Sequence, residues 1–195
     1  MDYLGTAAFN LSGGLKGARY RLDIFGLIVI STITGIGGGV IRDVFLGTIP
    51  PLALRSGNHI ALGVVSGVVV FFMKKYVEKE MKLLLVLDAI GLGIFTITGT
   101  DLGMSRGLGI WGSVTMGCLT GVGGGVIRDL LVNEIPIVLR KEIYALAGIL
   151  GGIMFYILSA AGVEKYLAIA VSVAAIVAFR LFSIWNHIEF PRIEK

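Results

Sequence analysis

The sequence TGIGGGVIRDVFLGTIP occupies residues 34–50, and a near copy, TGVGGGVIRDLLVNEIP, occupies residues 120–136. The two copies lie 86 positions apart and align without a gap. Each contains three consecutive glycines in an apolar segment, where every Gly costs a helix about 1 kcal/mol relative to Ala. A pattern this costly does not arise twice by chance, so the stretch identifies an internal repeat around which the chain is organised.

The glycine triplets have two interpretations in terms of helix physics. One is close packing, because Gly35 and Gly39 have the small-xxx-small spacing of membrane helix interfaces. The other is a paired break in two membrane helices that lines a path for an ion or small solute. We favour the break, because three glycines in a row exceed what packing needs and allow a helix to bend or open. The predicted hinge and pore residues are Gly37, Gly38, Gly39, Gly123, Gly124 and Gly125, bordered by Thr34 and Thr120.

The composition is that of a membrane protein. Of the 195 residues, 55% are hydrophobic and only 15% are charged, whereas soluble domains carry about 25% charge. We therefore predict an all-α membrane protein. The sequence has no Ser/His/Asp set, nucleotide-binding loop or metal-ligand spacing, and it does not interleave basic with aromatic residues. We accordingly expect no enzyme activity, metal, cofactor or nucleic-acid partner.

Seven transmembrane helices are predicted, as two inverted three-helix repeats followed by a seventh helix. The first repeat covers residues 2–77, the second residues 83–160, and the seventh helix residues 164–187. The predicted spans are residues 2–15, 22–46, 60–73, 83–100, 108–131, 143–158 and 166–185, with a basic loop at 16–21 and a hydrophilic linker at 74–82. An odd number of crossings per repeat places the second copy upside down relative to the first.

The distribution of basic residues predicts the orientation. With seven spans, the 17 basic residues divide 13 to 4 between the two sides of the membrane. By the positive-inside rule, the N-terminus faces out and the C-terminus faces the cytoplasm.

Ionisable groups near the triplets are the other candidate site residues. Intramembrane charges are functional candidates by default, because they are costly unless they pair or face a cavity. The alternative is a structural role as ion bridges that hold the helix ends. Asp88 could attract a cation or cap a helix start, and Lys141 with Glu142 could pair with the Arg–Asp groups or bind lipid head groups. The candidates for gating or ion pairing are Arg42, Asp43, Arg128, Asp129, Lys141 and Glu142.

The repeated GGGVIRD, the IP that follows it, and LRKEIYA at residues 139–145 resemble the trimeric intracellular cation (TRIC) channel family, and in particular its prokaryotic members, also labelled glycine-transporter-like membrane proteins. The resemblance covers nearly the whole chain. It implies a homotrimer in the prokaryotic plasma membrane, with a water-filled pore for monovalent cations, chiefly K⁺, in each protomer. It also implies second and fifth helices that bend at the triplets. Lys141-Glu142-Ile143 nearly matches the KEV motif of animal members.

The sequence therefore favours a K⁺ channel whose hydrated pore lies between spans one, two, four and five, with Thr, Ser and Asn side chains as its lining. A secondary transporter for a small solute such as glycine is the first alternative, because inverted repeats with broken helices suit alternating access equally well. A membrane scaffold without transport activity is the second.

Overall fold

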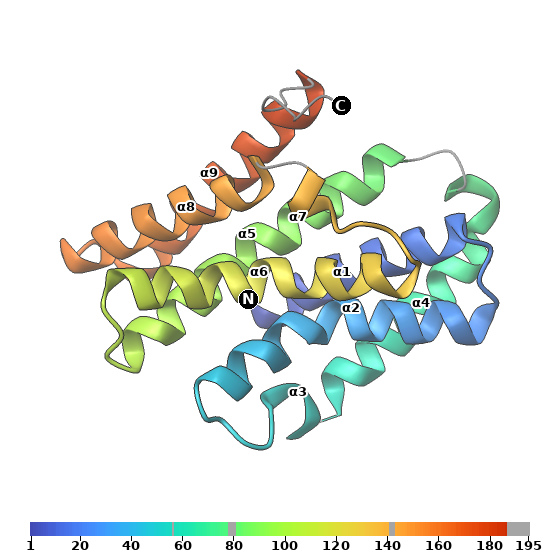
Figure 1. Ribbon diagram of the computed structural model, residues 1–195, viewed down its shortest axis with the longest axis horizontal. Helices are drawn as coiled ribbons and strands as arrows, with labels where there is room; N and C mark the ends of the chain where they lie inside the picture. Colours follow the sequence, from blue (N-terminus) through green and yellow to red (C-terminus); the bar gives the residue numbers. More distant parts are fainter. Residues whose placement is uncertain (56, 78–80, 141–142, 187–195) are drawn as a thin grey trace, which may run out of the picture.

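The computed structural model describes residues 1–55, 57–77, 81–140 and 143–186, and the regular secondary structure of this part of the chain is all α-helical (Figure 1). Its seven long helices correspond one to one with the predicted spans. The helices are α1 (Asp2–Arg19), α2 (Ile24–Phe45), α3 (Leu52–Arg55), α4 (Asn58–Val77), α5 (Met81–Ser105), α6 (Ile110–Leu131), α7 (Ile137–Arg140), α8 (Ile143–Ala160) and α9 (Lys165–Trp185). The two four-residue helices, α3 and α7, were not predicted.

Five of the described helices are long and apolar enough to cross a membrane, namely α2, α5, α6, α8 and α9. The apolar part of α4, Asn58–Met73, is shorter. Helix α1 carries polar residues and is packed among α2, α4 and α5. A helix enclosed by other helices needs no continuous apolar surface, which explains why α1 is less hydrophobic than the others.

Two segments predicted as connections are helical. The basic loop expected at 16–21 is mostly the end of α1, which continues to Arg19. Lys16, in this last part of α1, is buried and forms ion pairs with Asp129 and Glu134. The linker expected at 74–82 is likewise mostly helix, since α4 extends to Val77 and α5 begins at Met81.

The glycine triplets do not interrupt their helices, so the predicted helix breaks are wrong, while the bend at the triplets stays a prediction. Helices α2 and α6 each continue as α-helix through the triplet. They cross there so closely that a β-carbon at Gly38 would overlap the carbonyl oxygen of Thr120, and one at Gly124 would overlap that of Thr34. Each contact is the repeat counterpart of the other, so the crossing point lies on a pseudo-two-fold axis. The glycines therefore act first as a packing surface.

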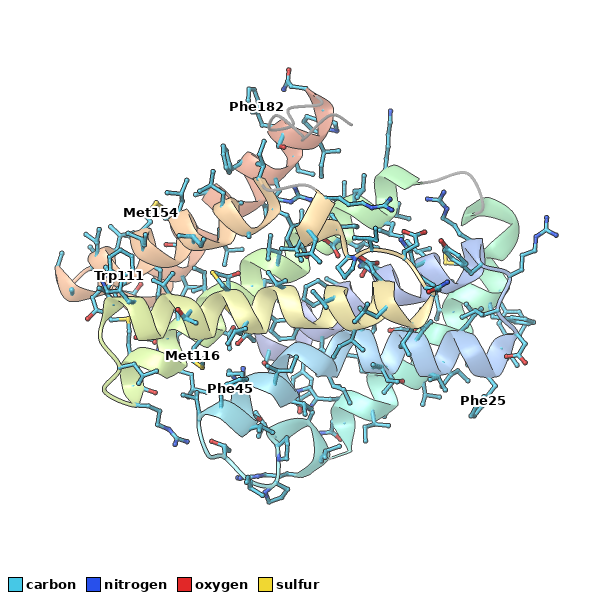
Figure 2. The ribbon with its side chains drawn as sticks, viewed as in Figure 1. Phe25, Phe45, Trp111, Met116, Met154 and Phe182 are labelled. Atoms are coloured by element: carbon cyan, nitrogen blue, oxygen red, sulfur yellow. The ribbon has the colours of Figure 1, made fainter. Side chains whose placement is uncertain are left out.

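The polarity of the fold is inverted relative to that of a soluble protein. Large apolar side chains project outward around the bundle, as Figure 2 shows for Phe25, Phe45, Trp111 and Phe182. Hydroxyl, amide and charged groups are instead buried between the helices. Lipid solvates an apolar exterior at no cost, while buried polar groups need partners inside the protein. The fold is therefore that of an all-helical membrane protein, as predicted.

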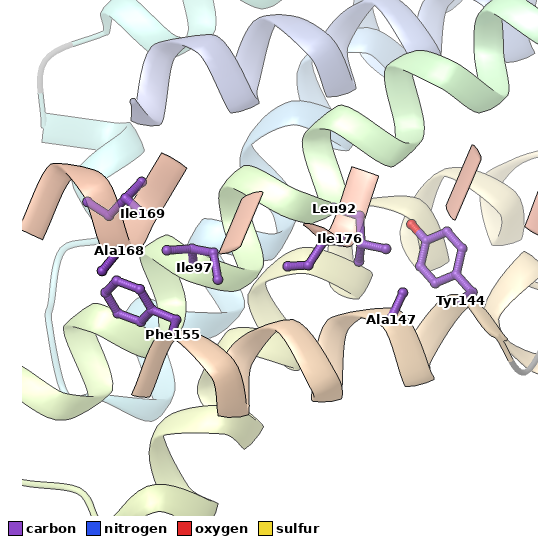
Figure 3. Close-up of a cluster of buried hydrophobic side chains, with 8 residues drawn as sticks. All are labelled: Leu92, Ile97, Tyr144, Ala147, Phe155, Ala168, Ile169 and Ile176. Atoms are coloured by element: carbon purple, nitrogen blue, oxygen red, sulfur yellow. The ribbon is translucent and has the colours of Figure 1, made fainter. Parts of the chain in front are cut away.

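The main apolar core joins α8 and α9 to α5. It contains Leu92, Ile97, Tyr144, Ala147, Phe155, Ala168, Ile169 and Ile176 (Figure 3). The side chain of Ile176 fills the space that a β-carbon at Gly151 would need, which brings α9 close to α8. Helix α9, which has no repeat counterpart, is thus packed firmly against the second repeat.

Candidate functional site

Small polar side chains are buried where α1 packs on α2 and where α5 packs on α6. Thr34 and Thr120, the repeat counterparts that border the triplets, are fully buried. Their hydroxyls donate to the carbonyls one turn earlier, Thr34 Oγ1 to Ile30 O at 2.6 Å and Thr120 Oγ1 to Met116 O at 2.6 Å. With its hydrogen committed in this way, each hydroxyl oxygen can only accept, so it presents lone pairs to any neighbouring donor or cation. The other fully buried small polar residues are Asn10, Ser12, Ser31, Thr96, Thr100 and Ser113.

A buried ion pair lies near the end of α2. Arg42 Nη2 lies 2.8 Å from Asp43 Oδ1, and both side chains are buried. The second oxygen of Asp43 accepts a hydrogen bond of 2.7 Å from the backbone nitrogen of Leu52, the first residue of α3. The carboxylate thus satisfies an otherwise free N–H at the start of that short helix. His59 from α4 and Asp2 from α1 pair at 2.7 Å and line the same hollow.

The second repeat reproduces this arrangement at the end of α6 and extends it. Arg128 Nε bonds Asp129 Oδ1 at 3.0 Å, and Asp129 Oδ2 accepts from the backbone nitrogen of Ile137 at 2.9 Å, where α7 begins. Arg128 Nη1 also reaches Asp88 Oδ1 at 2.6 Å and Ser12 Oγ at 3.1 Å. One fully buried arginine therefore joins α6 to α5 and α1.

The position of Asp88 excludes one of its two predicted roles, that of a helix cap. It is fully buried seven residues inside α5, which begins at Met81, so it does not cap a helix start. One of its oxygens is neutralised by Arg128, and the other, Oδ2, has no hydrogen-bond partner. The candidates Lys141 and Glu142 lie outside the described residues.

Lys16 is a site residue that the sequence interpretation missed. Its ammonium nitrogen lies 2.7 Å from Glu134 Oε2 and 3.5 Å from Asp129 Oδ1, and the side chain is buried. The hydroxyl of Tyr20 donates to the other oxygen of Glu134. Ser12, Lys16 and Tyr20 follow one another at four-residue spacing, which places them on one face of a helix. That periodicity was the available signal, and the basic character of the segment obscured it.

The network around Glu134 makes stability depend on pH. Hydrogen bonds from Lys16 and Tyr20 hold the pKa of the Glu134 carboxyl below its ordinary value, and the bond to Glu134 raises the pKa of the Tyr20 hydroxyl. A lowered pKa contributes stability above the ordinary value of about 4.3, and the contribution is lost as pH falls through the folded-state value.

We therefore expect Glu134→Gln to flatten the acid side of the stability profile. The apparent Tm of the wild type in detergent should fall more than that of the variant between pH 6 and pH 3. Because the Glu134 side chain is one-third exposed, the difference should correspond to less than about 1 kcal/mol. Parallel profiles would contradict the assignment.

Comparison with known proteins places this helical bundle within a family. The family model described as "Glycine transporter" matches residues 1–75 and 85–160. The UPF0126 inner membrane protein YadS of Escherichia coli K12 is 36% identical over 98% of this chain and 93% of its own length. A UPF0126 membrane protein of Vibrio cholerae is 35% identical over 98% of this chain and 80% of its own length.

Two solved structures share the fold. The TRIC trimeric intracellular cation channel orthologue from Rhodobacter sphaeroides superposes with a TM-score of 0.91 at 34% identity, covering 95% of this chain and 96% of that one. A prokaryotic TRIC channel crystallised in 0.5 M KCl superposes with a TM-score of 0.91 at 36% identity, covering 97% and 96%. The fold is that of these multi-pass membrane proteins of the cation-channel class. This chain belongs to the prokaryotic TRIC channel and UPF0126 family.

Proposed function

We propose that the protein is a K⁺ channel with one hydrated path inside each protomer of a homotrimer. The observation that carries the proposal is the set of small polar side chains buried among α1, α2, α5 and α6, with an Arg–Asp pair at the end of α2 and another at the end of α6. Oxygen ligands such as threonine hydroxyls and backbone carbonyls replace the hydration shell of a monovalent cation. The similar TRIC structures support this assignment.

The path opens, in this proposal, by relative movement of α2 and α6. Their contact at Gly38 and Gly124 is backbone against backbone, and it is flanked by the side chains of Ile127 against Gly37 and Ile41 against Gly123. Movement of α2 against α6 would therefore have to shift only these flexible side-chain ends. The Arg42–Asp43 and Arg128–Asp129 pairs lie about one turn beyond the crossing, so a shift of either helix moves a charged pair across the path. Acidic oxygens at both ends, Asp88 included, then favour cations over anions.

Secondary transport of a small solute is the competing function. The description of the matching family model, "Glycine transporter", is the observation in its favour. Two inverted repeats that meet through the close backbone contacts of Gly38 and Gly124 also suit alternating access.

Recording from purified protein in planar bilayers separates the two functions. We expect unitary current steps whose reversal potential follows the K⁺ gradient, because a hydrated path passes many ions per opening. Proteoliposomes tested with labelled glycine should show no saturable uptake. Saturable glycine uptake together with silent bilayers would reverse the assignment.

The seven-span topology with an external N-terminus is also proposed, from the distribution of basic residues. On a Cys118→Ala background, we expect Lys82→Cys to be labelled by an impermeant maleimide only from the cytoplasmic side, and Lys165→Cys only from outside. Both positions are exposed, so lack of labelling reports sidedness and not burial. Labelling of both from the same side would exclude the inverted arrangement.

Location and assembly complete the proposal. The Escherichia coli relative is an inner membrane protein, which supports the bacterial plasma membrane as the site of action. Membrane lipids would cover the apolar exterior, and the trimeric state can be checked by the mass of the detergent-solubilised protein.

A further inference from the structure

Helix α9 carries a charged residue that the proposed path does not use. Arg180 lies five residues before the end of α9 and is 1% exposed. Its guanidinium carbon sits 4.5 Å from the centroid of the Tyr144 ring. Two of its nitrogens, Nε and Nη2, have no hydrogen-bond partner. A buried arginine within a membrane helix is costly, so its retention calls for an explanation beyond packing.

The acceptors that could satisfy Arg180 are close by and equally unpaired. Asp88 Oδ2 and the Tyr144 hydroxyl are buried without hydrogen-bond partners. The carboxylate of Asp88 also lies within electrostatic reach of the Arg180 guanidinium. Asp88 and Tyr144 converge on one point, since a β-carbon at Gly125 would lie 3.4 Å from the Tyr144 hydroxyl and 3.7 Å from Asp88 Oδ1. Buried unpaired donors of Arg180 thus belong to the same cluster as the buried unpaired acceptors of Asp88 and Tyr144, which is rare in folded proteins.

The charge balance of this cluster depends on Arg180. Arg128 is shared between Asp88 and Asp129. Lys16 pairs with both Glu134 and Asp129, so the three cations Arg128, Arg180 and Lys16 balance the three carboxylates Asp88, Asp129 and Glu134. Without Arg180, the cluster around Asp88 would therefore become more negative by one charge.

We propose that Arg180 is a positioning residue for Asp88, and that it sets the net charge at the α6 end of the path. The inference rests on the proposed channel function. Arg180 holds the Tyr144 ring against the cluster and restrains the free oxygen of Asp88 electrostatically. Helix α9, which lies outside the two repeats, thereby takes part in ion selection. Among the described residues, the first repeat has no helix that corresponds to α9.

Reversal potentials in a KCl gradient test the electrostatic part. Arg180→Gln removes the positive charge, so the K⁺/Cl⁻ permeability ratio should rise at least about twofold. Arg180→Lys keeps the charge and should restore a ratio near that of the wild type. Ser172→Ala, at another fully buried polar position of α9, is the matched control and should leave the ratio unchanged. Equal ratios in the Gln and wild-type channels would overturn the proposal.

Thermal stability of the detergent-solubilised protein tests the coupling independently of any current. If Arg180 acts through Asp88, the Tm loss in Arg180→Gln combined with Asp88→Asn should be smaller than the sum of the single losses. Additive losses would overturn the positioning role. If the wild type passes no current in bilayers, the channel function is wrong, but this double-mutant comparison of Tm values still tests the coupling of Arg180 to Asp88. If the lysine variant assembles but neither Arg180→Gln nor Arg180→Met does, Arg180 is a folding residue, which also overturns the proposal.

Discussion

Gly38→Ala is expected to prevent assembly of the protein or to destabilise it by at least about 3 kcal/mol. The added β-carbon would overlap the backbone carbonyl of Thr120, and backbone at a helix crossing cannot move aside as a flexible side chain can. Helices α2 and α6 would have to separate along the whole seam. Gly124→Ala should have the same effect, because it meets the carbonyl of Thr34. Size-exclusion profiles and apparent Tm in detergent measure both.

The third glycine of each triplet provides the control. A β-carbon at Gly39 would meet only Arg42 Nη2 at 3.8 Å, and at Gly125 its neighbours begin at 3.4 Å, which is ordinary contact. Gly39→Ala should therefore assemble normally and gain up to about 1 kcal/mol from helix propensity. If Gly38→Ala and Gly39→Ala behave alike, the close-approach interpretation is wrong. If Gly39→Ala is stable but passes no current, the triplet serves flexibility as well as packing.

Arg128→Leu should cost about 3–5 kcal/mol, the range expected when one partner of a buried ion pair is removed. Two carboxylates, Asp88 and Asp129, would lose the same partner, although Lys16 still faces Asp129. Arg42→Leu should cost less, because only Asp43 pairs with Arg42 in the described part of the chain. Apparent Tm of the two variants, measured side by side, ranks the two clusters.

The exposed pair of Lys165 and Asp101 serves as the reference. Its side chains are 61% and 37% exposed, so Lys165→Ala should change stability by no more than about 0.5 kcal/mol. A loss for Arg128→Leu as small as this would mean that the buried network does not hold the helices together.

The long helices were predictable from sequence because each is an apolar run bounded by charged or turn-forming residues. The 86-residue offset between the repeats then matched each helix of the first repeat with one of the second, and it made Asp88 the counterpart of Asp2. The short helices α3 and α7 were not predictable in this way. They begin where the carboxylates of Asp43 and Asp129 accept backbone N–H groups from residues eight or nine positions later. Nothing in the four-residue segments themselves indicates a helix.

The sequence predicted most residues of the candidate site, but it predicted less well how the helices that carry them pack. The triplets and Arg–Asp pairs lie together, yet the helices continue without a break through the glycines, and the missing side chains allow α2 and α6 to approach each other closely. Lys16 was missed because its partners, Asp129 and Glu134, are more than a hundred residues away. Arg180 was missed because α9 has no copy with which to compare it. In both cases the partner residue lies far along the chain, and local spacing alone does not identify it.

The reciprocal contact of Gly38 with Thr120 and of Gly124 with Thr34 has an evolutionary consequence. A surface that packs on an inverted copy of itself is isologous, the type of interface formed by a symmetric dimer. A half-length ancestor carrying one TGxGGG segment could have made the same contact with a second molecule inserted in the opposite orientation. Fusion of two such genes would then fix the partner and the stoichiometry. It would also free each half to diverge, as Asp2 with His59 and Asp88 with Arg128 have done.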